Sequence, residues 1–426
     1  MKNNYLCLLL TIVLALSLGA MIHATALGAE KGLLEILRDN GIITQQQYEE
    51  LKKGAAKEPM IDTKGKLEIK SADDQFKFQI GGRIHADGAW YSIDKQDLGD
   101  GTELRRVHLD TSGTLWKDWH FTGQFDFANN DVSVRDAYLS YSELRLVTFK
   151  AGNFKVPHSL EVMMNNNWTT FMETGLPKAL TIGRRIGLGV DAHGDLWSIA
   201  AMGFGEGVSN SGVDEESGVA GRITLSPVHQ KTKVIHLGTW AALRDLTDTA
   251  ELRFHERPES HVTSVRLVDT GTISNVEDSI HYGFEGAGIY GPFSIQGEYI
   301  TVDVGRESGF SDVGFDGWYV YGSWIVTGES RSYSVKKGVF GEIKPKRNFS
   351  LEKGGKGALE LAVRYSTIDL NDGPIDGGDM DNWTMGVNWY PNPNIRFCFN
   401  YITVDSEKAG VSDDPHVFQV RAQVVF

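Results

Sequence analysis

Residues 76–91 read FKFQIGGRIHADGAWY, a stretch in which apolar and polar side chains alternate with a period of two. A strand of a soluble β-sandwich also alternates, but seldom over so many residues. A strand that crosses a bilayer at a tilt needs about 9–11 residues with one apolar face. The stretch therefore predicts a transmembrane β-strand. Its apolar face holds Phe76, Phe78, Ile80, Ile84, Ala86 and Trp90, and its polar face holds Lys77, Gln79, Arg83, His85 and Asp87.

The same period recurs from this stretch to the last residue of the chain. We expect about sixteen strands in one all-β fold, a transmembrane antiparallel β-barrel over residues 67–426. An even number suits a single-chain outer-membrane barrel, and about sixteen strands enclose a water-filled lumen. The expected strands are residues 76–91, 103–115, 119–128, 133–141, 145–154, 182–193, 195–205, 217–226, 233–244, 279–290, 293–304, 316–327, 357–369, 381–390, 394–405 and 416–426.

The connections between these strands alternate in length, which is typical of barrels with short periplasmic turns and long external loops. One connection departs from this rule, because residues 328–357 fall on the periplasmic side and yet form a long segment, which contains eight basic side chains. We expect it to form either a positively charged exit vestibule or a solvated loop. The long external connections are residues 155–181, 245–278, 305–315 and 371–380.

Composition excludes several classes of protein. The formal net charge of −14 over 426 residues argues against a nucleic-acid partner. Cys398 is the single cysteine after the leader, so no disulfide is expected within the mature chain. The chain lacks the GxSxG, Walker and HExxH motifs, so we expect neither an enzyme nor a bound metal or cofactor.

The N-terminal residues predict export. Residues 1–26 combine Lys2, an apolar run and a small-residue cleavage pattern, so we expect a signal peptide cleaved after Ala26 or Ala29. An uncleaved anchor helix is the alternative. Residues 30–64 predict a helical arm and linker, in which Thr44 and Gln47 form a capping box. This arm is either an oligomerisation element or a loosely docked extension.

One long stretch without strand periodicity is residues 155–181, KVPHSLEVMMNNNWTTFMETGLPKALT. A connection of this length between closely spaced strands is seldom passive. We expect it to fold into the lumen as a constriction loop.

Several motifs give the chain a resemblance to the phosphate-selective porin O/P family over nearly its whole mature length. The resemblance implies a trimeric sixteen-stranded channel in the bacterial outer membrane, in contact with outer-membrane lipid and lipopolysaccharide. It also implies that an inward loop narrows the lumen to an anion site. The matching pieces are GGR at 81–83, LRRVHLDTSGTLWKDW at 104–119, RDAYLSY at 135–141, VTFKAGNFKVPHSLE at 147–161, TGESRSY at 327–333, ELAVRYSTIDL at 360–370, GVNWYPNPNIRF at 386–397 and the terminal RAQVVF.

The resemblance assigns Arg105 and Arg106 to the anion site and places Arg83, Lys150 and Asp136 on lumen-lining strands. Strand parity agrees, except that it points Arg105 outward. The chain also departs from the family pattern, in which lysines occupy several of these positions. The departures are Val162 and Asn165, Asn166 and Asn167 in the loop, His120 after the Asp-Trp pair, and a thin external basic segment of Arg253, Arg257 and Arg266.

Further lumen-facing residues have two interpretations. Arg222, Arg364 and Arg421 fall on the polar parity and either line an anion path or pair with lumen acids such as Asp87 and Asp126. The lumen histidines either line the wall or form a pH-sensitive or metal-binding cluster. These histidines are His85, His108 and His120.

These observations together predict an outer-membrane porin that passes small hydrophilic solutes, prefers anions and is narrowed by residues 155–181. One alternative keeps the family's phosphate or polyphosphate selectivity. Another is a non-conducting adhesin or envelope anchor, and a third is a soluble periplasmic β-protein. The resemblance further implies a homotrimer.

Overall fold

A computed structural model describes residues 35–55, 59–63, 67–208, 216–246 and 251–426. The expected signal peptide lies outside these residues. The chain divides into two compact units, one of residues 1–81 with 111–121 and the other of residues 82–110 with 122–426.

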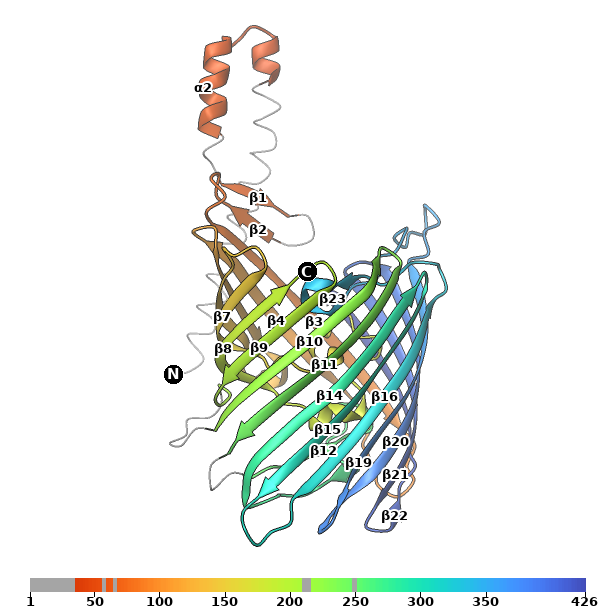
Figure 1. The fold of residues 1–426 in the computed structure, drawn as a ribbon. Helices are drawn as coiled ribbons and strands as arrows, with labels where there is room; N and C mark the ends of the chain where they lie inside the picture. The colour runs from red at the N-terminus through yellow and green to blue at the C-terminus, as the bar shows by residue number, and fades with distance from the viewer. Residues whose placement is uncertain (1–34, 56–58, 64–66, 209–215, 247–250) are drawn as a thin grey trace. The chain divides into compact units, whose positions relative to one another are not determined.

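The fold is the expected closed antiparallel β-barrel of sixteen strands (Figure 1). The predicted strands are all present, and the largest boundary error is at the strand predicted to begin at residue 381. The barrel strands are β3 (Lys77–Tyr91), β4 (Gly101–Leu115), β5 (Trp119–Asp126), β6 (Ser133–Tyr141), β7 (Val147–Lys155), β8 (Arg184–His193), β9 (Trp197–Phe204), β10 (Ser217–Gln230), β11 (Lys233–Asp245), β14 (Val276–Tyr290), β15 (Phe293–Arg306), β16 (Val313–Ile325), β19 (Ala358–Asp372), β20 (Ile375–Asn392), β21 (Ile395–Lys408) and β23 (His416–Val425).

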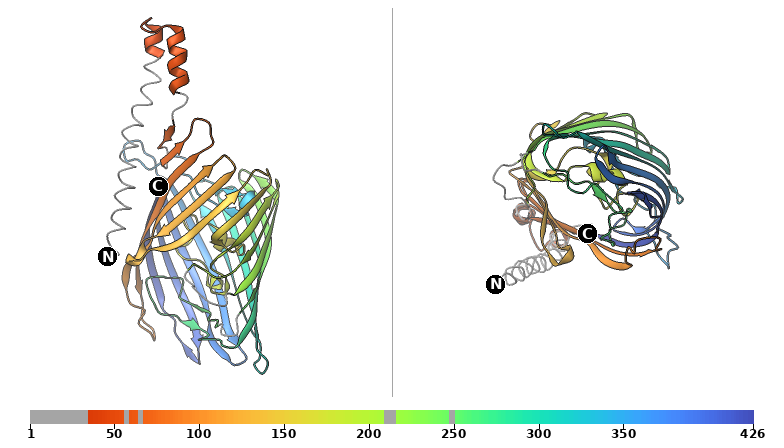
Figure 2. Two further views of the ribbon diagram at one scale, coloured as in Figure 1. Left: turned by 90° about the vertical axis from the view of Figure 1, so that its left-hand side faces the viewer. Right: turned by 90° about the horizontal axis from the view of Figure 1, so that it is seen from below.

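The last strand closes the barrel by pairing with the first, in a register that runs from Val417 opposite Tyr91 to Val425 opposite Arg83. Beyond this register, the Gly82 N–H donates to the Phe426 carbonyl oxygen at 2.8 Å and the Phe426 N–H donates back at 3.0 Å. A Cβ atom at Gly82 would lie 2.8 Å from the Phe426 ring. Glycine at this position therefore allows the terminal Phe to close the ring of strands (Figure 2, right).

Side chains alternate across the wall as the sequence predicts, with apolar residues outward and polar residues inward. On β19, Val363 is 45% exposed on the outside, whereas Arg364 is 1% exposed on the lumen side. Trp318 and Trp383 flank Tyr365 on the outer surface, with ring centroids 5.2 and 5.0 Å away. An exposed apolar surface of this kind suits the hydrocarbon core of a bilayer.

The expectation of an external loop at residues 371–380 is wrong. Strand β19 continues to Asp372, which pairs with Ile375 at the start of β20, so only two residues connect the strands. Gly373 has a φ of +52°, a conformation that favours glycine and permits this tight turn. The acidic residues of the stretch therefore belong to a long hairpin.

Five connections contain structure of their own. Between β7 and β8 lie α3 (Leu160–Met163) and the 3₁₀ helix η2 (Leu176–Leu180), which lie inside the ring of strands (Figure 2, right). The remaining short elements are η1 (Ala128–Asn130), β12 (His255–Glu256), β13 (Val268–Asp269), β17 (Tyr333–Ser334), η3 (Val335–Lys337), β18 (Val339–Phe340) and β22 (Val411–Ser412).

A hydrophobic core fills one side of the lumen. Leu176 and Leu180 of η2 pack there with Phe254 and Val268 of the β11–β14 connection, against wall residues such as Ile368 of β19. These apolar side chains exclude water from that side, so the described residues leave space for solutes on the other side of the loop.

The connection of residues 326–357 also folds inward, because Val339 and Phe340 of β18 pack against Leu160 and Met164 of the β7–β8 connection. Arg331 of this connection is 3% exposed. The expectation of a solvated loop is therefore wrong for these residues, whose apolar side chains gain from burial.

The first unit contains α2 (Gln45–Ala55), β1 (Met60–Asp62) and β2 (Leu67–Lys70), and β2 pairs with both β1 and β3. The predicted capping box is present: the Gln47 N–H donates to Thr44 Oγ1 at 3.2 Å, and the Thr44 N–H donates to Gln47 Oε1 at 2.9 Å. Among the described residues, no helix has the length and apolar character that a membrane-spanning helix needs.

Candidate functional site

Residues 156–183, hereafter the constriction loop, connect β7 to β8 and lie in the lumen. Ser159 begins α3, and its Oγ accepts a hydrogen bond from the Val162 N–H at 3.3 Å. The first N–H groups of α3, those of Leu160 and Glu161, donate to the two carboxylate oxygens of Glu298 at 2.8 and 2.7 Å. The loop is therefore attached to the wall strand β15 at its start.

Four buried arginines hold the middle of the constriction loop, and we call them the arginine clamp. Each donates to backbone carbonyl oxygens of residues 168–173, and each is at most 3% exposed. Such charge-assisted hydrogen bonds are about twice as strong as neutral ones. The bonds run from Arg331 to Trp168 (2.8 Å), from Arg396 to Thr169 and Thr170 (both 2.6 Å), from Arg421 to Met172 (2.6 Å) and from Arg364 to Glu173 (3.0 Å).

The clamp arginines are also paired with side chains outside the constriction loop. Arg331 contacts Glu360 at 2.8 Å, Arg364 contacts Glu259, and Arg421 contacts Asp87 at 2.6 Å. Arg396 donates to the Asn388 amide oxygen at 2.9 Å. The expected lumen position of Arg364 and Arg421 is confirmed, but their charges are matched by acids and carbonyl groups. Arg222 behaves alike, since it contacts Glu285 at 2.6 Å and donates to the Gly338 carbonyl oxygen.

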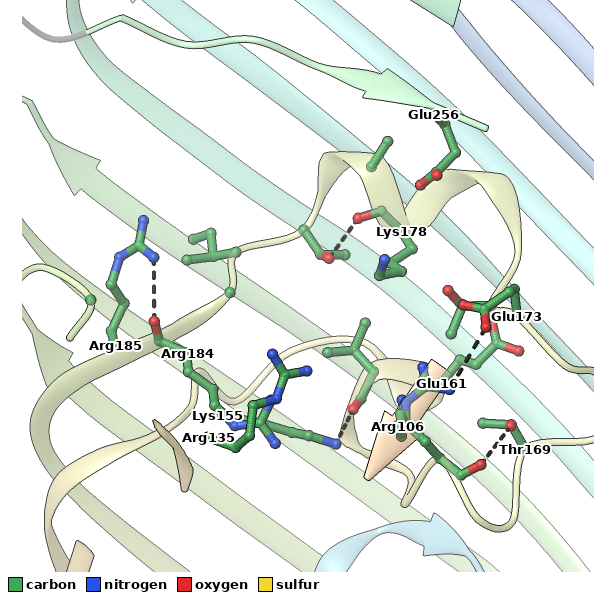
Figure 3. A pocket seen from close by; sticks show the side chains of 18 of the residues that line it. Arg106, Arg135, Lys155, Glu161, Thr169, Glu173, Lys178, Arg184, Arg185 and Glu256 are labelled. Carbon is green, nitrogen blue, oxygen red and sulfur yellow. Dashed lines mark hydrogen bonds and ion pairs between the residues drawn. The ribbon is translucent and has the colours of Figure 1, made fainter. Parts of the chain in front are cut away.

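On its other side the constriction loop borders a chamber of about 630 Å³ against β4, β6, β7 and β8 (Figure 3). Nine basic side chains line this chamber against four carboxylates, although the whole chain is acidic. The basic residues are Arg105, Arg106, Arg135, Lys155, Lys178, Arg184, Arg185, Arg253 and Arg266, and the acids are Glu161, Glu173, Glu206 and Glu256.

Four of these cations, Arg135, Lys155, Lys178 and Arg266, form no ion pair with a carboxylate of the described residues. The Arg135 Nε is buried and has no hydrogen-bond partner there. Lys155 donates through Nζ to the carbonyl oxygens of Val162 and Met164 at 2.6 and 2.8 Å. Unpaired cations in a partly desolvated space favour anions.

Arg105 and Arg106 both reach the chamber and both contact Glu173 of the constriction loop. Arg105 binds this carboxylate with two hydrogen bonds, from Nε at 3.0 Å and from Nη2 at 3.1 Å, and Arg106 Nη1 lies 3.7 Å away. The outward orientation that parity predicts for Arg105 is therefore wrong. Neighbouring residues of a regular strand face opposite sides, so the alternation of β4 is interrupted between these two residues.

The carboxyl groups of Glu173 and Glu161 lie in different electrostatic surroundings, which shift their pKa values in opposite directions. Burial by itself raises the pKa of Glu173, but attraction by Arg105, Arg106 and Arg421 outweighs it and holds that pKa well below its usual value. Burial raises the pKa of Glu161, and the nearby Arg364 offsets this only in part. Glu173 is therefore the firmly charged acid of the pair.

The three loop asparagines do not act alike. Asn165 accepts a hydrogen bond from Arg83 through Oδ1 at 2.9 Å, and Asn167 Oδ1 lies 3.1 Å from His85 Nε2. Both amides therefore hold the loop to β3, while Asn166 lines the chamber. Arg83 also contacts Asp110 at 3.1 Å.

Asp136 and Lys150 lie on the lumen side but belong to separate ion pairs. Asp136 Oδ1 accepts from Arg184 Nε at 2.7 Å at the edge of the chamber. Lys150 contacts Asp191 and lies outside the residues that line the chamber. Asp136 therefore affects the chamber only through its ion pair with Arg184, and Lys150 does not belong to the chamber lining.

The histidines do not form a shared cluster. His108 Nε2 lies 3.0 Å from Asp126 Oδ2, and His120 Nδ1 lies 3.0 Å from Thr114 Oγ1. No group of three or more histidine, cysteine or acidic residues in the described part of the chain is arranged to hold a metal ion.

The external basic segment reaches the chamber in part. Arg253 lines it and is paired with Asp269, to whose Oδ1 it donates at 2.8 Å. Arg257 donates to the His261 carbonyl oxygen at 2.9 Å and lines a smaller cavity of about 180 Å³.

Sequence reasoning missed Arg135, Lys155, Lys178 and the Arg184–Arg185 pair as chamber residues. Arg135 falls inside the quoted RDAYLSY motif, and Arg184 and Arg185 stand together at the start of β8. A basic pair directly after the constriction loop was the available signal. Lys178 lies in η2, whose orientation depends on packing and not on a strand period.

A closed barrel of sixteen antiparallel strands, with a polar lumen and an inward loop, defines a porin of the outer membrane. The chain belongs to the family described as phosphate-selective porin O and P, whose model matches residues 78–426. It is 28% identical to Porin O of Pseudomonas aeruginosa over 413 residues, which cover 86% of this chain and 92% of that protein.

Solved structures with a similar fold include two bacterial outer-membrane proteins. The trimer form of OmpT of Vibrio cholerae has a TM-score of 0.52 and 14% identity, covering 83% of this chain and 100% of OmpT. The anion-selective porin of Comamonas acidovorans has a TM-score of 0.52 and 11% identity, covering 82% of this chain and 99% of that porin. These similarities concern the fold.

Proposed function

We propose that this outer-membrane porin prefers anions and that its solutes pass the chamber beside the constriction loop. The observation that supports the proposal is the excess of basic side chains around the chamber, four of them without a carboxylate partner among the described residues. Fixed positive charge in a narrow, partly desolvated space raises the local concentration of anions. The chain acts as a channel and not as an enzyme.

Reversal potentials in planar bilayers test this proposal. With the purified protein between two KCl solutions of different concentration, we expect a potential whose sign reports chloride permeating faster than potassium. A reversal potential of the opposite sign would contradict the anion preference, and a protein without conductance would contradict the channel.

Tight phosphate selectivity is the second candidate, because it gives the family its description. Here Val162 occupies one of the expected lysine positions, and the Asn165 and Asn167 amides are engaged by Arg83 and His85. A dehydrated phosphate needs close cationic donors to replace its hydration. We therefore expect millimolar and not micromolar phosphate to block chloride current, and micromolar block would establish the second candidate.

We also propose a homotrimer in contact with outer-membrane lipid and lipopolysaccharide, since OmpT is described in a trimer form. Chemical cross-linking of the protein in native outer membranes should give a threefold species on gels. The export signal of residues 1–26 remains a proposal as well, and N-terminal sequencing of the mature protein tests cleavage after Ala26.

A further inference from the structure

We propose that Glu173 is a built-in counter-ion that occupies an oxyanion position at Arg105 and Arg106 and thereby weakens the binding of permeating anions. The inference rests on the proposed function, because it requires that anions enter the chamber. The Glu173 carboxylate of the constriction loop then determines how strongly the chamber binds planar or tetrahedral oxyanions.

The contacts of Glu173 have the geometry with which arginines bind a free oxyanion. Arg105 approaches through Nε and Nη2, so the two carboxylate oxygens each accept one hydrogen bond, at 3.0 and 3.1 Å. Arg421 Nη2 adds a third contact at 2.8 Å, and Arg106 Nη1 lies 3.7 Å away. A paired fork of this kind matches both carboxylates and phosphates.

The backbone holds the Glu173 carboxylate in this position. The Glu173 carbonyl oxygen accepts from Arg364 Nη1 at 3.0 Å, and the preceding Met172 is bound through its carbonyl oxygen by Arg421 and through its N–H by Asn400. Because the loop on both sides of the carboxylate is fixed, the charge is delivered to the arginine pair at little conformational cost.

Neutralising Glu173 would leave Arg105 and Arg106 without an acidic contact among the described residues. Arg421 keeps its two bonds to Asp87, at 2.7 and 2.6 Å. Arg106 Nη1 keeps a contact with His85 Nδ1 at 3.4 Å. Both guanidinium groups line the chamber, so a permeating oxyanion would find two donors with free charge.

A purely structural brace is the competing explanation, in which Glu173 serves only to hold the loop. The two explanations differ in their readouts. A brace predicts that neutralising Glu173 lowers stability or increases current noise but leaves oxyanion affinity unchanged. A counter-ion predicts a gain in oxyanion affinity.

The test measures the block of chloride current by inorganic phosphate in single-channel recordings. Glu173→Gln keeps the side-chain shape, and we expect half-block at about a tenfold lower phosphate concentration than in the wild type. Glu206→Gln, which removes an equal charge from the part of the chamber beside Arg184 and Arg185 and outside the smaller cavity that Arg105 and Glu173 share, should shift half-block by about twofold or less. Equal shifts in the two variants would overturn the inference.

A double-mutant cycle keeps the inference testable if the loop in Glu173→Gln relaxes. Arg105→Gln alone should weaken phosphate block, but by less than in the Glu173→Gln background, because in the wild type Glu173 occupies the Arg105 donors. In the Glu173→Gln background the same change should remove most of the gain. Additive effects in this cycle would contradict the counter-ion. Glu173→Asp, which keeps the charge, should bind phosphate nearly as weakly as the wild type.

The inference and the proposed function fail separately. If the wild type prefers cations but Glu173→Gln gains phosphate affinity, the counter-ion stands and the anion preference falls. If the wild type prefers anions and Glu173→Gln gains nothing, the counter-ion alone is contradicted.

Discussion

The constriction loop has basic side chains on both of its sides, and those on one side are paired more fully than those on the other. Towards β19, β21 and β23 the clamp residues are buried and bonded to backbone carbonyl groups. Towards the chamber, Arg135 and Lys178 form no ion pair with described carboxylates. The number of arginines in the lumen therefore does not by itself define an anion path. What matters is which of them lack a partner.

The largest effect is expected from breaking the clamp. Arg364→Ala leaves the Glu259 carboxylate buried without its cation and the Glu173 carbonyl group without a donor. The loss should reach about 3–5 kcal/mol of the free energy of unfolding. The measurement is urea unfolding in detergent, followed by tryptophan fluorescence.

Arg266→Gln is the matched control for the clamp variant, because it removes an unpaired arginine from the chamber side. Its unfolding free energy should change by less than about 0.5 kcal/mol. Comparable losses in Arg364→Ala and Arg266→Gln would remove the distinction between the two sides.

The next largest effect is expected from neutralising the chamber. Arg135→Gln combined with Lys178→Gln removes two unpaired cations and should lower the ratio of chloride to potassium permeability by about fivefold. The stability of the protein should stay unchanged, since neither cation forms an ion pair with the described residues. The reversal potential in a KCl gradient reports the ratio.

The control for this pair is Lys231→Gln with Lys233→Gln, at the turn between β10 and β11 and outside the chamber lining. If the control pair lowers the permeability ratio as far as the chamber pair does, net charge and not chamber charge determines selectivity.

A smaller effect should follow from returning one family lysine. Val162→Lys places an ammonium group at the chamber wall, where Val162 now lies. Phosphate should then block chloride current at about threefold lower concentration, because the variant adds one cation to a lining that is already basic. No change in block would indicate that phosphate does not approach this side of the loop.

The smallest effect concerns pH. The groups that face the Glu173 carboxylate are Arg105 and Arg106 on β4 and Arg421 on β23, and they hold its pKa well below the usual value. A lowered pKa means that the negative charge persists above the usual glutamate value and is lost only at still lower pH. The difference in sulfate block between the wild type and Glu173→Gln should therefore persist at about pH 4, where a glutamate with its usual pKa is largely protonated. Sulfate replaces phosphate in this measurement because its charge does not change over the range. A difference that disappears as the pH falls through the usual glutamate value would show that Glu173 titrates normally.

The barrel could be predicted from the sequence alone, because the alternation of apolar and polar residues is visible within each strand. It does not require knowledge of which strands pair with each other. The prediction failed at residues 371–380, where glycine and acidic residues suggested a loop although the strands continue into a tight turn. The constriction loop was located by its length and missing period. Its attachment was not predictable, since the clamp bonds to carbonyl groups that every residue possesses.

The site was predicted less completely for a related reason. Parity correctly placed Arg83, Arg106 and Asp136 in the lumen, yet it cannot report which partner each residue finds. It also misplaced Arg105, because a local break in alternation reverses the face of a strand. The counter-ion Glu173 comes from a segment without regular period, and only the folded loop brings it to the arginines.

A crystal structure of the protein soaked in bromide would show, through anomalous scattering from the bound ions, whether the unpaired chamber cations or the clamp arginines attract anions. We expect bromide in the chamber beside Arg135, Lys155 and Lys178, and none in contact with the arginine clamp. Bromide bound at the clamp residues, or a chamber without any bromide, would contradict this expectation.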